Sequence, residues 1–110
     1  MSSSTLRARS LPVLLALVAA SATAQAPAQF PGGDPKQGAA MTTKDCNGCH
    51  VRRFGDVPTA YTRIDRRVNT PAQLKAQIAY CNSQLGTGYF PEEEEHIAAY
   101  LDLEYYKFKP

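Results

Sequence analysis

The sequence lacks several features, and each absence narrows the fold or the function. No stretch of the chain alternates apolar and polar residues in the manner of β-strands, so we expect an all-α fold. There is also no marked excess of one charge. Arg7 and Arg9 precede the apolar run at residues 11–20, and the chain after that run carries ten basic and ten acidic residues. Such a balance argues against a nucleic-acid binder.

The first 24 residues have the organisation of a secretory signal peptide. Two arginines precede the apolar run, and the small-residue sequence Ala22-Thr23-Ala24 follows it. The run contains Pro12 and is too short to cross a bilayer comfortably, which argues against an uncleaved membrane anchor. We expect cleavage after Ala24, with Ala26 as the second choice, export to the periplasm, and no membrane span in the mature protein.

The sequence Cys46-Asn47-Gly48-Cys49-His50 has the spacing of a c-type haem attachment site. Two thiols three residues apart can each form a thioether with a haem vinyl group, and the adjacent histidine can then bind the iron. Export agrees with this, because bacteria attach haem c outside the cytoplasmic membrane. The motif predicts one covalent haem c, with Cys46 and Cys49 as thioether residues and His50 as the proximal iron ligand.

Two other kinds of site could contain the same cysteines. A thioredoxin-like redox site requires a strand–helix–strand setting, and the sequence predicts no strands. A structural zinc site could use Cys46, Cys49, Cys81 and His96. That site would leave His50 without a role, and the spacing from Cys81 to His96 matches no common zinc framework. A zinc-stabilised interaction module is therefore the alternative from another functional class.

Three helices are predicted in the domain at residues 34–110, which follows a flexible tail at 25–33 rich in alanine, proline and glycine. Each helix has proline at its first position, where the missing N–H does no harm: Pro35, Pro71 and Pro91. Asp34 and Thr70 are the N-caps of the first two. Residues 51–69 show no sustained helical period, so we expect a loop around the haem, with a short turn near residues 61–64.

The chain resembles class I cytochromes c over essentially its whole mature length. Gly38 stands eight residues before Cys46, the haem motif follows, and the last predicted helix carries the apolar sequence at residues 97–101. The resemblance implies a class I cytochrome c fold, with about three helices around one haem. It also implies that the first and last helices cross at near right angles. A glycine in a helix interior suits such a contact, because it allows close backbone approach.

The sixth iron ligand departs from that family, because no methionine follows the haem motif and Met41 lies on the first predicted helix. Residues 69–101 resemble the sphaeroides haem protein group, whose asparagine ligand dissociates on reduction and admits small ligands such as oxygen. In that group the ligand precedes the first cysteine of a disulfide-closed loop. Tyr80 stands at the ligand position here and Tyr89 at that of the partner cysteine, so neither feature carries over to this chain.

Five residues are candidates for the distal ligand. Cys81 could bind iron as a thiolate and give a low potential, or be a small buried apolar residue. Asn82 is a weak neutral ligand, although such residues more often form caps and turns. Tyr80 would need deprotonation, and Lys75 is a distant possibility. His96 would give bis-histidine ligation, but its place beside the glutamates at 92–95 favours a solvated histidine.

Five arginines fall in the segment expected to border the haem: Arg52, Arg53, Arg63, Arg66 and Arg67. They could hold the haem propionates, dock an acidic redox partner, or form a solvated basic loop. We expect a carrier of single electrons between partner proteins and not an enzyme. The alternative is a haem protein that binds or reduces a small ligand, such as oxygen or carbon monoxide, at a labile distal site.

Overall fold

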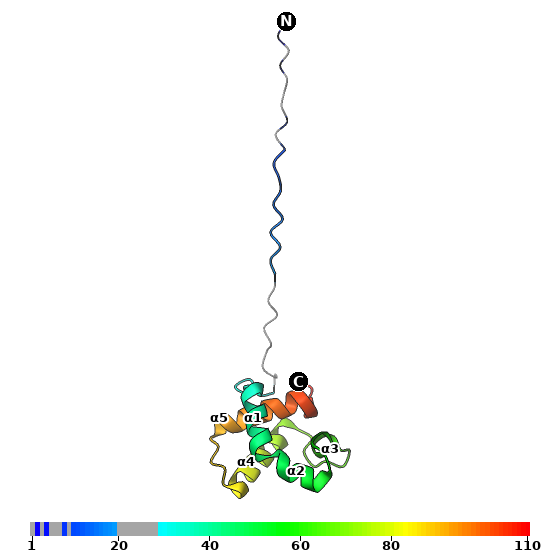
Figure 1. Ribbon diagram of the computed structural model, residues 1–110, viewed down its shortest axis with the longest axis vertical. Coiled ribbons are helices and arrows are strands. Elements are labelled where there is room, and N and C mark those ends of the chain that lie inside the picture. The colour runs from blue at the N-terminus through cyan, green and yellow to red at the C-terminus, as the bar shows by residue number, and fades with distance from the viewer. Residues whose placement is uncertain (1, 3, 5–7, 9, 20–28) are drawn as a thin grey trace.

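The computed structural model describes residues 2, 4, 8, 10–19 and 29–110, and its regular elements are helices. They are α1 (Pro35–Asp45), α2 (Asn47–Phe54), α3 (Val57–Thr62), α4 (Pro71–Leu85), α5 (Pro91–Leu101) and the π-helix η1 (Asp102–Tyr106), as Figure 1 shows. No strand occurs in these ranges, which confirms the all-α class for the part of the chain described.

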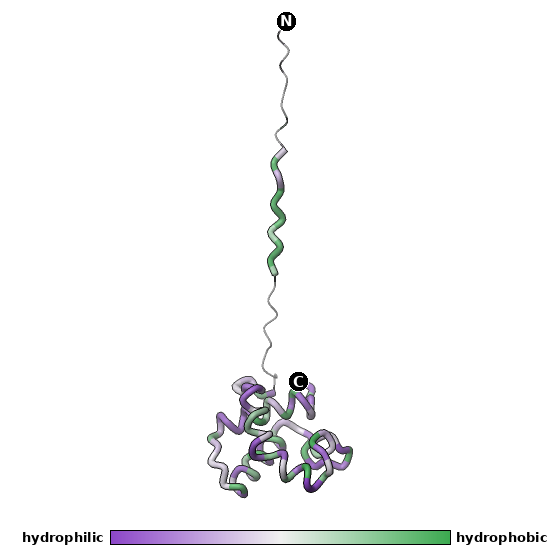
Figure 2. Tube along the Cα trace, viewed as in Figure 1, coloured by the Kyte–Doolittle hydropathy of each residue, from purple (hydrophilic) through white to green (hydrophobic). Residues whose placement is uncertain are grey.

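Residues 10–19, which hold most of the predicted signal peptide's apolar run, have no regular secondary structure. The apolar residues of this segment colour the tube green in Figure 2, and their side chains are exposed, Leu14 to 91% and Leu17 to 94%. Among the described residues, no helix is long and apolar enough to cross a membrane. The expected cleavage sites and most of the predicted tail lie outside the described residues, so the signal peptide stays a prediction.

The predicted helix starts are confirmed, because each cap makes its local hydrogen bond. The Asp34 carboxylate accepts from the Lys36 backbone N–H at 2.9 Å, and the Thr70 hydroxyl accepts from the N–H of Gln73 at 3.2 Å. Pro35, Pro71 and Pro91 each open their helix. At the start of α5, Glu93 reaches back and accepts from the backbone N–H of Phe90 at 2.8 Å.

The prediction of a loop at residues 51–69 is wrong for its first two thirds, because α2 and α3 occupy them. Gly55, with φ of +95°, ends α2, and Asp56 then caps α3 by accepting from the Thr59 N–H at 2.8 Å. Both helices are too short to show an apolar period. Ala60 and Tyr61 of α3 are both buried, so tertiary packing stabilises this short helix.

Helices α1 and α5 cross in close contact, as Figure 1 shows. A Cβ atom added to Gly38 would lie 1.8 Å from the backbone oxygen of His96, and one added to Gly33 would lie 2.5 Å from that of Glu95. Neither position can therefore hold a side chain. The predicted role of Gly38, close approach by another helix, is confirmed.

The core lies where α1, α4 and α5 meet. Leu74 and Ile78 of α4 face Ile97 and Leu101 of α5, and Phe30, which precedes α1, is fully buried in the same cluster. Most of the apolar sequence noted at residues 97–101 is thus buried in this core. The same faces of α4 and α5 continue into one side of a cleft between α4 and the junction of α1 with α2.

Candidate functional site

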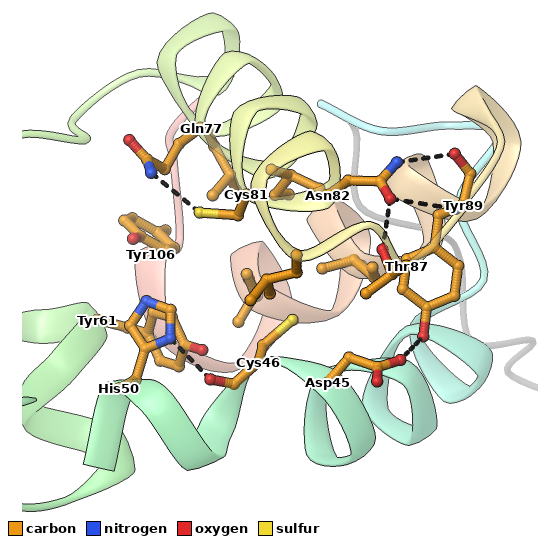
Figure 3. A pocket seen from close by; sticks show the side chains of 15 residues that line it. Asp45, Cys46, His50, Tyr61, Gln77, Cys81, Asn82, Thr87, Tyr89 and Tyr106 are labelled. Atoms are coloured by element: carbon orange, nitrogen blue, oxygen red, sulfur yellow. Dashed lines mark hydrogen bonds between the residues drawn. The ribbon is translucent and has the colours of Figure 1, made fainter. Parts of the chain in front are cut away.

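A mostly apolar cleft separates α4 from the α1–α2 junction (Figure 3). It contains about 550 Å³ of space, including its opening to solvent. Its lining residues come from α1 to α5 and η1, from the α1–α2 junction and from the segment between α4 and α5: Asp45, Cys46, His50, Tyr61, Leu74, Gln77, Ile78, Cys81, Asn82, Leu85, Thr87, Tyr89, Ile97, Leu101 and Tyr106. Residues far apart in the sequence are thus brought to one chamber.

Cys46 and Cys49 occupy different parts of this region. Cys46 is half-buried and lines the cleft between α1 and α2. Burial and then the nearby Asp45 carboxylate raise the pKa of its thiol to about 11. Cys49 is exposed outside the cleft lining, and its Sγ accepts a hydrogen bond from Arg52 at 3.1 Å. The structure therefore places Cys46 in the cleft lining and Cys49 outside it.

The imidazole of His50 is oriented by its neighbours and left with one free nitrogen. Its Nδ1 lies 2.9 Å from the backbone oxygen of Cys46, and since a carbonyl can only accept, Nδ1 carries the proton in this bond. The Nε2 atom then keeps its lone pair. The ring packs on Tyr61 with 4.8 Å between centroids. A histidine that donates through one nitrogen to a backbone carbonyl is well placed to bind a metal through the other.

A basic cleft adjoins the apolar one and shares His50, Gln77 and Tyr106 with it. Four of the five predicted arginines line it: Arg53, Arg63, Arg66 and Arg67. Arg63 lies over the Phe54 ring at 4.1 Å, and Arg66 donates to the Tyr61 carbonyl at 3.1 Å. The Nε atom of Arg63 is buried and donates no hydrogen bond within the described part of the chain. Through Nη1 the same guanidinium forms an ion pair with the Asp65 carboxylate at 3.3 Å.

Two of the distal candidates, Cys81 and Asn82, line the apolar cleft from α4. Gln77, one helical turn before Cys81, donates to its Sγ at 3.2 Å. The Asn82 amide is used within the protein: its oxygen accepts from the Tyr89 N–H at 3.1 Å, and its nitrogen donates to the Tyr89 carbonyl at 2.8 Å and to Glu94 at 3.2 Å. Asn82 therefore organises the turn after α4, which was its alternative role.

The other three candidates lie elsewhere. Tyr80 is 61% exposed and does not line the cleft. His96 sits in the crossing of α1 and α5, where its Nδ1 accepts from the Asp34 N–H at 2.8 Å. The expected solvated histidine is thus wrong, because α1 covers that face of α5. Lys75 is exposed and lies with Glu92, Glu94 and Glu95 in a separate surface hollow.

The zinc alternative finds no assembled ligand set in the described chain. No three His, Cys, Asp or Glu side chains come together there as a metal site. His96 is held by Asp34, while Cys46 and Cys81 line the cleft and Cys49 lies outside it. Of the four residues that the sequence could assign to zinc, the structure therefore brings two, Cys46 and Cys81, to one cleft and leaves Cys49 and His96 outside it.

Four further residues contribute to the site: Tyr61, Gln77, Asp45 and Tyr89. No sequence pattern marked the first three as site residues, and Tyr89 was noted only because it occupies a cysteine position of the sphaeroides haem protein group. The Tyr89 hydroxyl donates to the Asp45 carboxylate and so joins the segment before α5 to the end of α1 beside the cleft. Burial and then this hydrogen bond raise the pKa of Tyr89 to about 12. The partners are 44 residues apart, so no local signal could have paired them.

The side chains present fit a covalently attached haem. Cys46 provides a thiol inside an apolar chamber, His50 provides a free ring nitrogen at its edge, and the adjoining arginines match an anionic rim. No protein-family model, curated protein or solved structure matches the chain.

Proposed function

We propose that the protein is an exported single-haem c-type cytochrome, of class I fold, that carries single electrons. The observation that carries the proposal is the placement of the Cys46 thiol and the His50 imidazole in one apolar cleft. Cys49 stands three residues after Cys46 and directly before His50. Cys46 and Cys49 would hold the haem through thioethers, and Nε2 of His50 would bind its iron. The bound iron would supply a one-electron couple.

The protein's own contribution would be orientation and exclusion of water. The Cys46 carbonyl fixes the tautomer and direction of His50, and Tyr61 supports one face of the ring. Burial raises the pKa of the Tyr61 hydroxyl, so it stays protonated while it donates to Asn47 at 3.2 Å. Apolar side chains would cover the haem and keep the local dielectric constant low, among them Leu74, Ile78 and Ile97.

The basic cleft would bind the anionic edge of the same group. Arg63 has a buried donor with no partner in the described chain, and Arg66 is held in place by its bond to the Tyr61 carbonyl. Guanidinium groups form strong paired hydrogen bonds with carboxylates such as haem propionates. The exposed Arg52, Arg53 and Arg67 would instead steer an acidic redox partner toward this edge.

A second candidate function, binding of a small ligand such as oxygen or carbon monoxide, is favoured by one observation. None of the described residues that line the cleft is a methionine. The iron would therefore lack the distal ligand usual for class I cytochromes c. A weaker or displaceable ligand on that side would open the iron to small molecules.

The test is periplasmic expression of the full chain together with the haem c maturation proteins, followed by acid-acetone extraction and a visible spectrum. We expect haem to stay with the wild-type protein, because thioethers survive this extraction, and the reduced protein to show sharp α and β bands. Cys46→Ala and Cys49→Ala should each leave at most one thioether. Cys81→Ser is the matched control and should keep both.

Three results would contradict the proposal. Complete extraction of haem from the wild type would show that the cysteines form no thioethers. A protein without a Soret band that contains stoichiometric zinc would favour the interaction module. A high-spin reduced spectrum with covalent haem would favour ligand binding over electron transfer.

A further inference from the structure

The two facing walls of the apolar cleft carry different side chains that could bind a metal. One wall carries Cys46 and His50 at the α1–α2 junction, and the opposite wall, on α4, carries Cys81 with Gln77 beside it (Figure 3). We propose that Cys81 is the distal iron ligand and that Gln77, through its hydrogen bond to the Cys81 sulfur, sets the strength of that ligand. The inference rests on the proposed function, because it presupposes haem attached next to His50.

Of the five distal candidates, Cys81 and Asn82 line the cleft, and of these two only Cys81 is not bound into the turn after α4. Both ends of the Asn82 amide are bound within the turn after α4, and Nδ1 of His96 is bound to α1. Tyr80 is 61% exposed and does not line the cleft. Cys81 is half-buried in the cleft lining and is not in a disulfide.

Gln77 and Cys81 lie four residues apart on α4, so their side chains lie on the same face of the helix. The amide Nε2 of Gln77 donates to Sγ of Cys81 at 3.2 Å, and both residues line the cleft. A donor directed at a thiolate withdraws electron density from sulfur and weakens its bond to iron, which raises the reduction potential. Gln77 is therefore a positioning residue that would act on the metal through Cys81.

Ligation by this thiol consumes no oxidant or reductant. The sulfur lone pair forms the bond, and the thiol proton leaves to water. An anionic ligand binds ferric iron more strongly than the more electron-rich ferrous iron. The same residue would therefore hold the oxidised iron strongly and the reduced iron weakly. The reduced protein alone would keep this ligand and its sharp α and β bands, whereas carbon monoxide could displace the ligand.

The experiment uses the full-length protein with its haem attached and records electron paramagnetic resonance of the oxidised state. We expect the low-spin signal with compressed g-anisotropy that thiolate ligation produces. Cys81→Ser should abolish this signal and raise the midpoint potential, because the thiolate preferentially stabilises ferric iron. Tyr80→Phe, on the neighbouring but outward position of α4, is the matched control and should leave both properties unchanged.

Gln77→Leu tests whether Gln77 acts on the iron through the Cys81 sulfur or only supports the helix. It should keep the thiolate signal and lower the midpoint potential, since the sulfur loses its hydrogen bond and becomes a stronger donor. Carbon monoxide should bind the reduced wild-type protein rapidly. Cys81→Ser should bind it at least as fast.

The wild-type spectrum decides the assignment even if a variant fails to fold. Covalent haem without a thiolate signal in the wild type would overturn the role of Cys81 and leave the proposed function intact. Covalent haem with identical spectra in wild type and Cys81→Ser would overturn it equally. Loss of all haem on extraction would overturn both proposals together.

Discussion

The contact between Gly38 and α5 allows a perturbation to be calculated from the structure. In Gly38→Ala the added Cβ would lie 1.8 Å from the His96 backbone oxygen, whereas contacts below 3.0 Å are essentially never observed. The backbones of α1 and α5 would therefore have to separate by roughly 1.2 Å. No rotamer change can relieve this, because the obstructing atom belongs to the main chain.

The cost follows from the packing that this movement disturbs. Overpacking a close contact typically costs about 1–3 kcal/mol, and a backbone clash lies at the upper end of that range. Alanine regains at most about 1 kcal/mol through its better helix propensity. We expect a net loss of about 2 kcal/mol in the free energy of unfolding. For a domain of this size, that corresponds to a fall of roughly 8–16 °C in the midpoint of thermal unfolding.

Guanidinium unfolding of the purified protein, followed by far-UV circular dichroism, measures this loss. Gly48→Ala is the matched control: it is also a helical glycine, but its nearest contact would be the flexible end of Arg52 at 3.6 Å. That change should be neutral or stabilise by about 0.4–1 kcal/mol. If Gly38→Ala proved as stable as Gly48→Ala, the close approach of α1 and α5 would be refuted.

Three further predictions concern acid stability, a buried carboxylate and processing. The hydrogen bonds from Gln37 and from the Lys36 N–H hold the pKa of Asp34 below its usual 3.8. The stability that the ionised Asp34 contributes is therefore present above pH 3.8, and it is lost as the pH falls through the lower pKa of the folded state. Asp34→Asn, which keeps the cap, should flatten that part of the stability–pH curve; an unchanged curve would contradict the assignment. Asp102 is buried and its carboxylate accepts a hydrogen bond from the Phe108 N–H at 2.8 Å. Asp102→Ala should therefore lower the free energy of unfolding by about 1–3 kcal/mol. Asp65→Ala, at an exposed position, should change it little. Intact-mass analysis of exported protein should place its N-terminus at Gln25, or at Pro27 by the second choice, and a retained leader would refute the cleavage.

Local signals were enough for much of the fold and for part of the candidate site. The prolines and caps at the starts of α1, α4 and α5 act on backbone groups two or three residues away, so the sequence contains both partners of each bond. The spacing of Cys46, Cys49 and His50 is equally local, and it predicts haem chemistry without any knowledge of how the helices pack. Gly38 indicated a close contact, because a glycine costs stability in a helix interior unless another backbone needs the space.

Only the tertiary structure decided which side chains meet. The bond from the Asp34 N–H to His96 spans 62 residues and removes a histidine that the sequence left open as a ligand. The turn after α4 occupies the amide of Asn82, and the packing of α4 against α5 brings Cys81 opposite His50. Such pairings depend on how the helices pack against one another. That packing results from many weak contacts between distant residues, so no short stretch of sequence predicts it. The sequence by itself therefore predicted the attachment chemistry and determined the helix starts, while the fold decided which side chains line the two walls of the cleft.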